Sequence, residues 1–127
     1  MGLRIAIGSG RCSDLARSRN PNLREMCKRL LSRIEHLQAL PPEALRSLPP
    51  CTSEHERIGS QVLSFNTYRE HATSGDCLLV VQGFLPSWRF PHYFGPAGVG
   101  FIAAEGLVLS QAGALGNAPD ALLWEFR

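Results

Sequence analysis

An apolar stripe between residues 20 and 40 limits the fold of this chain more than any other feature. Asn20-Pro21 is typical of a helix N-cap followed by proline at the first helical position. The spacing beyond it predicts an amphipathic helix of about five turns that ends near Leu40, before Pro41. Its apolar positions recur at steps of three and four: Leu23, Met26, Cys27, Leu30, Leu31, Ile34 and Leu37.

Three shorter segments flank this helix. Ser13 is a candidate cap for a short helix that runs through Arg19. The stretch 40–50 predicts one short helix between two proline stops. Residues 51–56 are polar, and we interpret them as a linker between a helical half and a strand-like half.

The second half of the chain carries strand patterns. Residues 61–68 alternate in part, and 77–84 form a nearly continuous apolar run that is typical of a central strand. Residues 99–109 predict a third strand, and 122–126 predict a fourth strand at the edge of the sheet. Because turn-length links join these segments, we expect an antiparallel meander, with the apolar helix stripe packed across one face.

These patterns predict a single α+β domain over residues 1–127, in which N-terminal helices pack on an antiparallel sheet of about four strands. The helical part is expected at 1–50 and the sheet part at 58–127. No apolar run approaches the ~20 residues of a membrane helix. The apolar stretch at the N-terminus is too short for a secretory signal.

The cysteine and arginine content indicates a cellular compartment and a type of source organism. The four cysteines lie far apart in the sequence: Cys12, Cys27, Cys51 and Cys77. Because no secretion signal accompanies them, we expect reduced thiols in a cytoplasmic protein. Twelve of the thirteen basic residues are Arg, which indicates a GC-rich coding bias and therefore a bacterial source.

The motifs nearest to cofactor, metal or thiol chemistry fail on spacing. Residues 5–10 resemble a dinucleotide-binding glycine turn, but Ser13 stands where the third glycine belongs. Cys51 and His55 lack the repeated short spacing of zinc ligands, and flanking carboxylates oppose a thiolate at Cys51. The sequence therefore predicts no cofactor, no metal site and no catalytic residue, and it leaves open whether the protein is an enzyme.

The most unusual composition lies in residues 84–96, which hold five aromatic residues and three prolines. Such a loop either folds back on the core or presents a recognition surface, and Trp, Tyr and Arg dominate binding hot spots. We therefore expect a small, non-catalytic binding or interaction domain whose partner is a protein or a small molecule. The candidate binding residues are Trp88, Arg89, Phe90, His92, Tyr93, Tyr68 and Arg69.

Two alternatives stay open. A small enzyme or small-molecule-binding protein would use His92 or His71 as a general base, with Arg89 holding an anion. A nucleic-acid accessory protein would use the arginines of residues 1–33, where eight bases face two acids. The pI near 8.5 and the lack of a known nucleic-acid-binding motif disfavour that partner. The expected edge strand at 122–126 is compatible with a homodimer.

Overall fold

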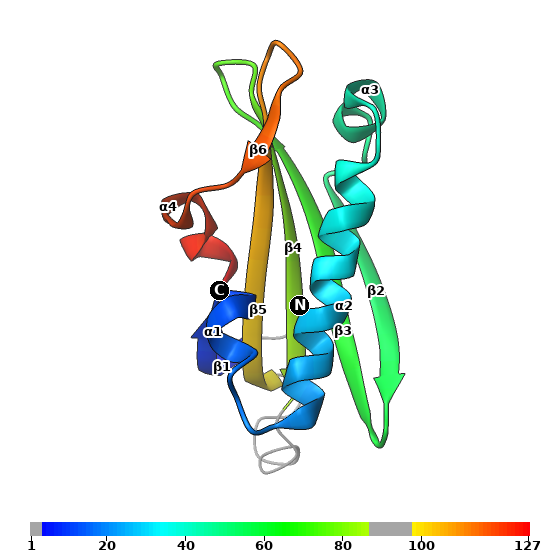
Figure 1. Ribbon diagram of the computed structural model, residues 1–127, viewed down its shortest axis with the longest axis vertical. Helices are drawn as coiled ribbons and strands as arrows, with labels where there is room; N and C mark the ends of the chain where they lie inside the picture. Colours follow the sequence, from blue (N-terminus) through cyan, green and yellow to red (C-terminus); the bar gives the residue numbers. More distant parts are fainter. Residues whose placement is uncertain (1–3, 87–97) are drawn as a thin grey trace.

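The computed structural model describes residues 4–86 and 98–127 (Figure 1). The chain is of the α+β class, as the sequence predicts. The helical elements are α1 (Cys12–Leu15), α2 (Pro21–Gln38), α3 (Pro42–Arg46), α4 (Asp120–Leu123) and the 3-10 turn η1 (Trp124–Phe126). The strands are β1 (Arg4–Gly10), β2 (Cys51–Ile58), β3 (Gln61–His71), β4 (Cys77–Pro86), β5 (Gly98–Leu109) and β6 (Leu115–Asn117).

The strands that the structure describes form one six-stranded sheet in the order β1-β5-β4-β3-β2, with β6 also paired to β5. Strands β2 to β6 pair antiparallel, but β1 runs parallel to β5. The predictions of about four strands and of a wholly antiparallel sheet are therefore wrong. Two of the additional strands, β1 and β2, lie in the half that was expected to be helical or linker.

The segment 51–56 is part of strand β2 and not a linker. It pairs with β3 along its whole length, from Cys51 opposite Tyr68 to Ile58 opposite Gln61. Most of its side chains are exposed because β2 is the outer strand of the sheet. Polar and charged residues are normal on such edges, since they discourage pairing with other chains. Because these residues are polar, the sequence pattern did not predict a strand here.

The segment 122–126 is helical and not an edge strand. Leu123 and Phe126 are buried, whereas Leu122 and Trp124 are exposed. The buried positions are thus three residues apart, which suits a helical turn and not the alternation of a strand. A homodimer through an edge strand at these residues has therefore lost its basis.

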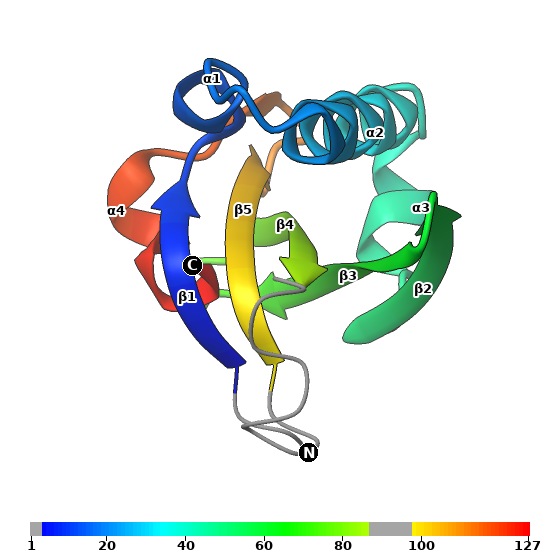
Figure 2. The ribbon, with the colours of Figure 1, turned by 90° about the horizontal axis from the view of Figure 1, so that it is seen from below.

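Helix α2 lies along one face of the sheet, which curves around it (Figures 1 and 2). The Asn20 side chain caps the helix by accepting from the backbone N–H groups of Asn22 and Leu23, at 3.0 and 3.3 Å. A Cβ atom at Gly83 would lie 3.2 Å from side-chain atoms of Met26 and Leu30, so a larger residue there would have to push these side chains aside by a few tenths of an ångström. The helix buries Leu23, Met26, Cys27, Leu30, Ile34 and Leu37.

Helix α4 and η1 cover part of the opposite face of the sheet (Figure 2). Leu123 and Phe126 pack there with Val80 and Ala104 from the two central strands. The sheet therefore carries one core under α2 and a smaller one under its C-terminal turns. No helix in the described parts of the chain is both long and apolar enough to cross a membrane.

Candidate functional site

Most of the predicted binding residues lie outside the part of the chain that the structure describes. These are Trp88, Arg89, Phe90, His92 and Tyr93. Within residues 84–96, the structure describes 84–86, which end strand β4. Recognition through this loop therefore stays a prediction.

The structure does not bring Tyr68 and Arg69 together. They are consecutive residues of β3, so their side chains point to opposite faces of the sheet. Arg69 donates from Nε to the Leu48 carbonyl, which ties β3 to the chain after α3. Tyr68 opposes Val80, about 20 Å along β4 from Pro86, where the strand ends.

The Tyr68 hydroxyl belongs to a polar cluster on the face that η1 covers. It donates to Oε1 of Gln82 at 3.4 Å, and Asn66 Nδ2 donates to the same oxygen at 3.2 Å. Ser53 in turn donates to Oδ1 of Asn66 at 2.7 Å. The Tyr68 ring also packs on Phe126, with 5.2 Å between the ring centres. These contacts give Tyr68 a structural role.

His71, one of the two candidate bases of the enzyme alternative, is the exposed last residue of β3. It pairs with Cys77, the first residue of β4. It therefore lies at the opposite end of β4 from Pro86, about 30 Å along the strand. Gln61 lies much nearer to Pro86, since its Nε2 donates to the Pro86 carbonyl at 2.6 Å. Sequence reasoning missed Gln61 because this proximity arises from strand pairing.

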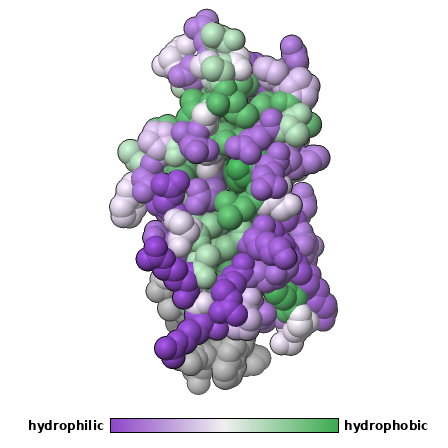
Figure 3. All heavy atoms as spheres, viewed as in Figure 1, coloured by the Kyte–Doolittle hydropathy of each residue, from purple (hydrophilic) through white to green (hydrophobic). Residues whose placement is uncertain are grey.

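Arg29 and Arg33 of α2 point toward strand β2. The nucleic-acid alternative would use both of them. Arg29 pairs with Glu25 and with Glu56, each at 3.1 Å. Arg33 pairs with Glu54 at 3.0 Å and with Glu56. Their charge is therefore largely compensated within the fold, which leaves less of it for phosphate groups. Figure 3 shows the face of the molecule on which α2 lies, where a band of apolar residues runs between hydrophilic ones.

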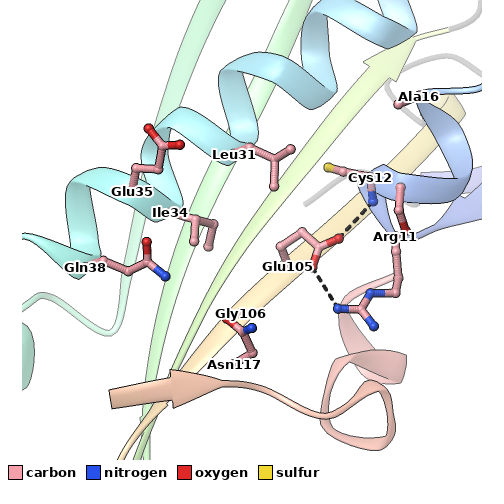
Figure 4. A pocket seen from close by; sticks show the side chains of 11 residues that line it. Arg11, Cys12, Ala16, Leu31, Ile34, Glu35, Gln38, Glu105, Gly106 and Asn117 are labelled. Carbon is pink, nitrogen blue, oxygen red and sulfur yellow. Dashed lines mark hydrogen bonds and ion pairs between the residues drawn. The ribbon is translucent and has the colours of Figure 1, made fainter. Parts of the chain in front are cut away.

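A pocket of about 440 Å³ opens between α1, α2, β5 and β6 (Figure 4). Its lining combines charged and amide groups with an apolar wall. Helix α2 contributes Leu31 and Ile34, and α1 contributes Ala16 just beyond its end. The polar lining residues are Arg11, Ser13, Glu35, Gln38, Glu105 and Asn117.

Glu105 is the central polar group of this pocket. Its neighbours two positions away in β5, Ala103 and Leu107, are buried in the core under α2, so the carboxylate projects on the same face. Oε1 accepts from the backbone N–H of Cys12 at 2.9 Å, and Oε2 lies 3.6 Å from Nη2 of Arg11. The Glu105 side chain is 14% exposed. A carboxylate this buried needs partners, and α1 supplies them.

Arg11 spans two carboxylates without holding either tightly. Its Nη1 lies 3.5 Å from Oδ1 of Asp120, in addition to the 3.6 Å contact with Glu105. Both distances exceed the 2.7–3.2 Å range of an ordinary N–H···O hydrogen bond. The Arg11 side chain is also 40% exposed. The guanidinium therefore keeps donor capacity for a further acceptor.

Sequence reasoning missed this site, although one signal was present. Glu105 interrupts the apolar run 101–109. A charge in a buried strand costs free energy unless it is paired or functional. Its partner Arg11 lies far away in sequence, so no spacing rule connects the two. Within the residues that the structure describes, no group of three or more His, Cys, Asp or Glu side chains could hold a metal ion.

A second pocket, of about 460 Å³, lies between α2, the chain around α3, β2 and β3. Its lining includes Ser32, His36 and Thr52. Its cation, Arg33, is already bound by two glutamates and stacks over Phe65. The first pocket is the better candidate because its charged groups are only loosely paired.

Comparisons of the chain with protein-family models, with curated proteins and with solved structures found no match.

Proposed function

We propose that this chain is a non-catalytic binding domain that holds a small zwitterion, such as an α-amino acid, in the pocket between α1, α2, β5 and β6. The observation that carries the proposal is the loose pair of Arg11 and Glu105, 3.6 Å apart at the wall of that pocket. A ligand carboxylate would take the free donors of the guanidinium. A ligand ammonium would take the lone pairs that remain on Glu105.

The rest of the lining supports an amino acid with an apolar side chain. Leu31, Ile34 and Ala16 form an apolar wall, and Gln38 and Asn117 add amide groups. The volume of about 440 Å³ falls in the range typical of small-molecule sites. A few placed polar groups on a largely apolar wall are the usual design of such a pocket.

Binding is favoured over catalysis because the polar groups at this pocket engage one another in supporting contacts. Arg11 faces two carboxylates, and Glu105 caps the first backbone N–H of α1. Groups that support one another in this way orient a charged ligand by hydrogen bonds, which is the role that the proposal gives them.

Three matched probes test the proposal by calorimetry: leucine, isopentylamine, which lacks the carboxylate, and 4-methylpentanoate, which lacks the ammonium. We expect leucine to bind most tightly. Glu105→Gln should weaken leucine and isopentylamine about tenfold or more, since a hydrogen bond to a charged group contributes ~1.5–3 kcal/mol. Arg11→Gln should weaken leucine and 4-methylpentanoate but spare isopentylamine.

Glu70→Gln, an exposed change at the end of β3, is the matched control and should leave all three affinities unchanged. Circular dichroism of Glu105→Gln checks that α1 and the fold survive the loss of charge. Equal leucine affinity in the wild type and both pocket variants, or no leucine binding by the wild type, would overturn the proposal.

Recognition through residues 84–96 remains a second proposal, supported by their aromatic and proline content. Sedimentation of the wild type and Trp88→Ala tests it. Self-association or partner binding that Trp88→Ala abolishes would support the loop as a recognition surface. We also propose a cytoplasmic location, which the four free thiols support.

A further inference from the structure

Two of the four cysteines lie side by side although they are far apart in sequence. Cys12 begins α1, Cys27 lies in the first half of α2, and the two helices pack against each other. Both residues are only 1% exposed and belong to the core under α2. The other two thiols are separate, because Cys51 is exposed on the edge strand β2 and Cys77 is buried at the start of β4.

A hydrogen bond from the Cys12 thiol to Cys27 shifts the pKa values of the two thiols in opposite directions. It raises the pKa of Cys12, and burial and the charges of Cys27 and Glu105 raise it further. The same hydrogen bond lowers the pKa of Cys27, against the opposing effect of burial. Cys27 therefore loses its proton first, and the thiolate is the form that reacts with oxidants.

The pocket gives a small oxidant a route to this pair. Cys12 is one of the lining residues, and its sulfur points toward α2 (Figure 4). Helix α1 is only four residues long, and short elements at the edge of a fold open locally more readily than its core.

We propose that Cys12 and Cys27 are a redox modification site, which hydrogen peroxide converts into an intrachain disulfide between α1 and α2. The Cys27 thiolate attacks one peroxide oxygen, the O–O bond breaks, and the hydroxide that leaves takes up a proton. Cys27 is then a sulfenic acid. The Cys12 sulfur attacks the Cys27 sulfur and displaces hydroxide, which leaves as water with the Cys12 proton. Altogether, two thiols lose two electrons and one peroxide becomes two waters.

Mass spectrometry of the native protein after peroxide treatment tests this proposal. The Cys51→Ser variant prevents disulfides between molecules and leaves three thiols. After oxidation it should lose the mass of two hydrogen atoms. When the oxidised protein is denatured, two of its three thiols should be unreactive until a reductant is added. Peptide mapping should find Cys12 joined to Cys27.

Cys77→Ser in the same background is the matched control, because it removes a buried thiol that lies outside the pair, and the disulfide should still form. Cys12→Ser and Cys27→Ser should each prevent it. In the wild type, exposed Cys51 reports that peroxide is active. If Cys12 and Cys27 both stay reduced while Cys51 is fully oxidised, or if Cys77 enters the disulfide, the proposal is wrong. The result is independent of leucine binding, so the two proposals can fail separately.

Discussion

The guanidinium carbon of Arg33 lies 3.8 Å from the centre of the Phe65 ring. The same guanidinium donates to the carboxylates of Glu54 and Glu56. Phe65 is a core residue, 1% exposed, and Arg33 covers its ring at the boundary between α2 and the sheet. One side chain thus joins the apolar core, the helix and the edge strand β2, and a cation over an aromatic face contributes ~0.5–2 kcal/mol.

The Glu56→Gln variant should lose stability in a pH-dependent way. The hydrogen bond from Arg33 is the main cause that lowers the pKa of Glu56 below its ordinary value of 4.5. Because the folded pKa is lowered, the stabilisation is complete above the ordinary value and disappears as the pH falls through the lowered one. Urea unfolding at about pH 7 should show a loss of ~0.5–1 kcal/mol, which is small because Glu56 is partly exposed. The loss should shrink near pH 3. Exposed Glu70→Gln is the control. A stability difference between the wild type and Glu56→Gln that does not change with pH would contradict the argument.

The Gly100→Ala variant should be strongly destabilised. An added Cβ would overlap the Leu85 carbonyl oxygen and lie 2.8 Å from the Cα of Pro86, so the backbones of β4 and β5 would have to separate. Overpacking typically costs ~1–3 kcal/mol, and a clash with backbone belongs at the upper end. Gly116→Ala in β6 is the matched control, because nothing lies within 4 Å of the position that its Cβ would occupy. Chemical denaturation of both variants measures the difference, and equal stabilities would contradict the close approach of the two strands.

The Leu30→Ala variant should be far less stable than Leu31→Ala. Leu30 is fully buried against the sheet, whereas Leu31, one position along α2, is 44% exposed. Truncation of a buried leucine costs ~2–5 kcal/mol, and surface changes usually stay within ~0.5 kcal/mol. Thermal unfolding of the two variants tests which side of α2 faces the core. Similar losses at both positions would place the helix in a different rotation.

The Asn20→Ala variant should destabilise the start of α2 by ~1 kcal/mol, because two backbone N–H groups lose their acceptor. Asn20→Asp keeps an oxygen at the same place and should retain nearly all of the stability. Urea midpoints of the three proteins measure the effect. If Asn20→Ala is harmless, or if Asn20→Asp loses as much stability as Asn20→Ala, the cap does not contribute as the structure implies.

Short-range patterns were enough to predict the elements that form the centre of the fold. The helix expected from residue 21 is α2, and the strands expected at 61–68, 77–84 and 99–109 lie within β3, β4 and β5. Each of these segments has a clear apolar pattern, periodic or continuous, because one or both of its faces contact the core. The pattern failed for β2, whose faces are largely exposed, and for 122–126, where too few residues distinguish a turn of helix from a strand.

The sequence by itself determined the α+β class, the capped helix and the central strands, because periodicity and capping act between residues close in the chain. Only the tertiary structure decided that β1 joins β5 in parallel, and that Arg11, Cys12 and Glu105 meet beneath α2. These contacts join residues about ninety positions apart. They depend on how whole elements pack, and the spacing of residues along the chain does not predict that packing.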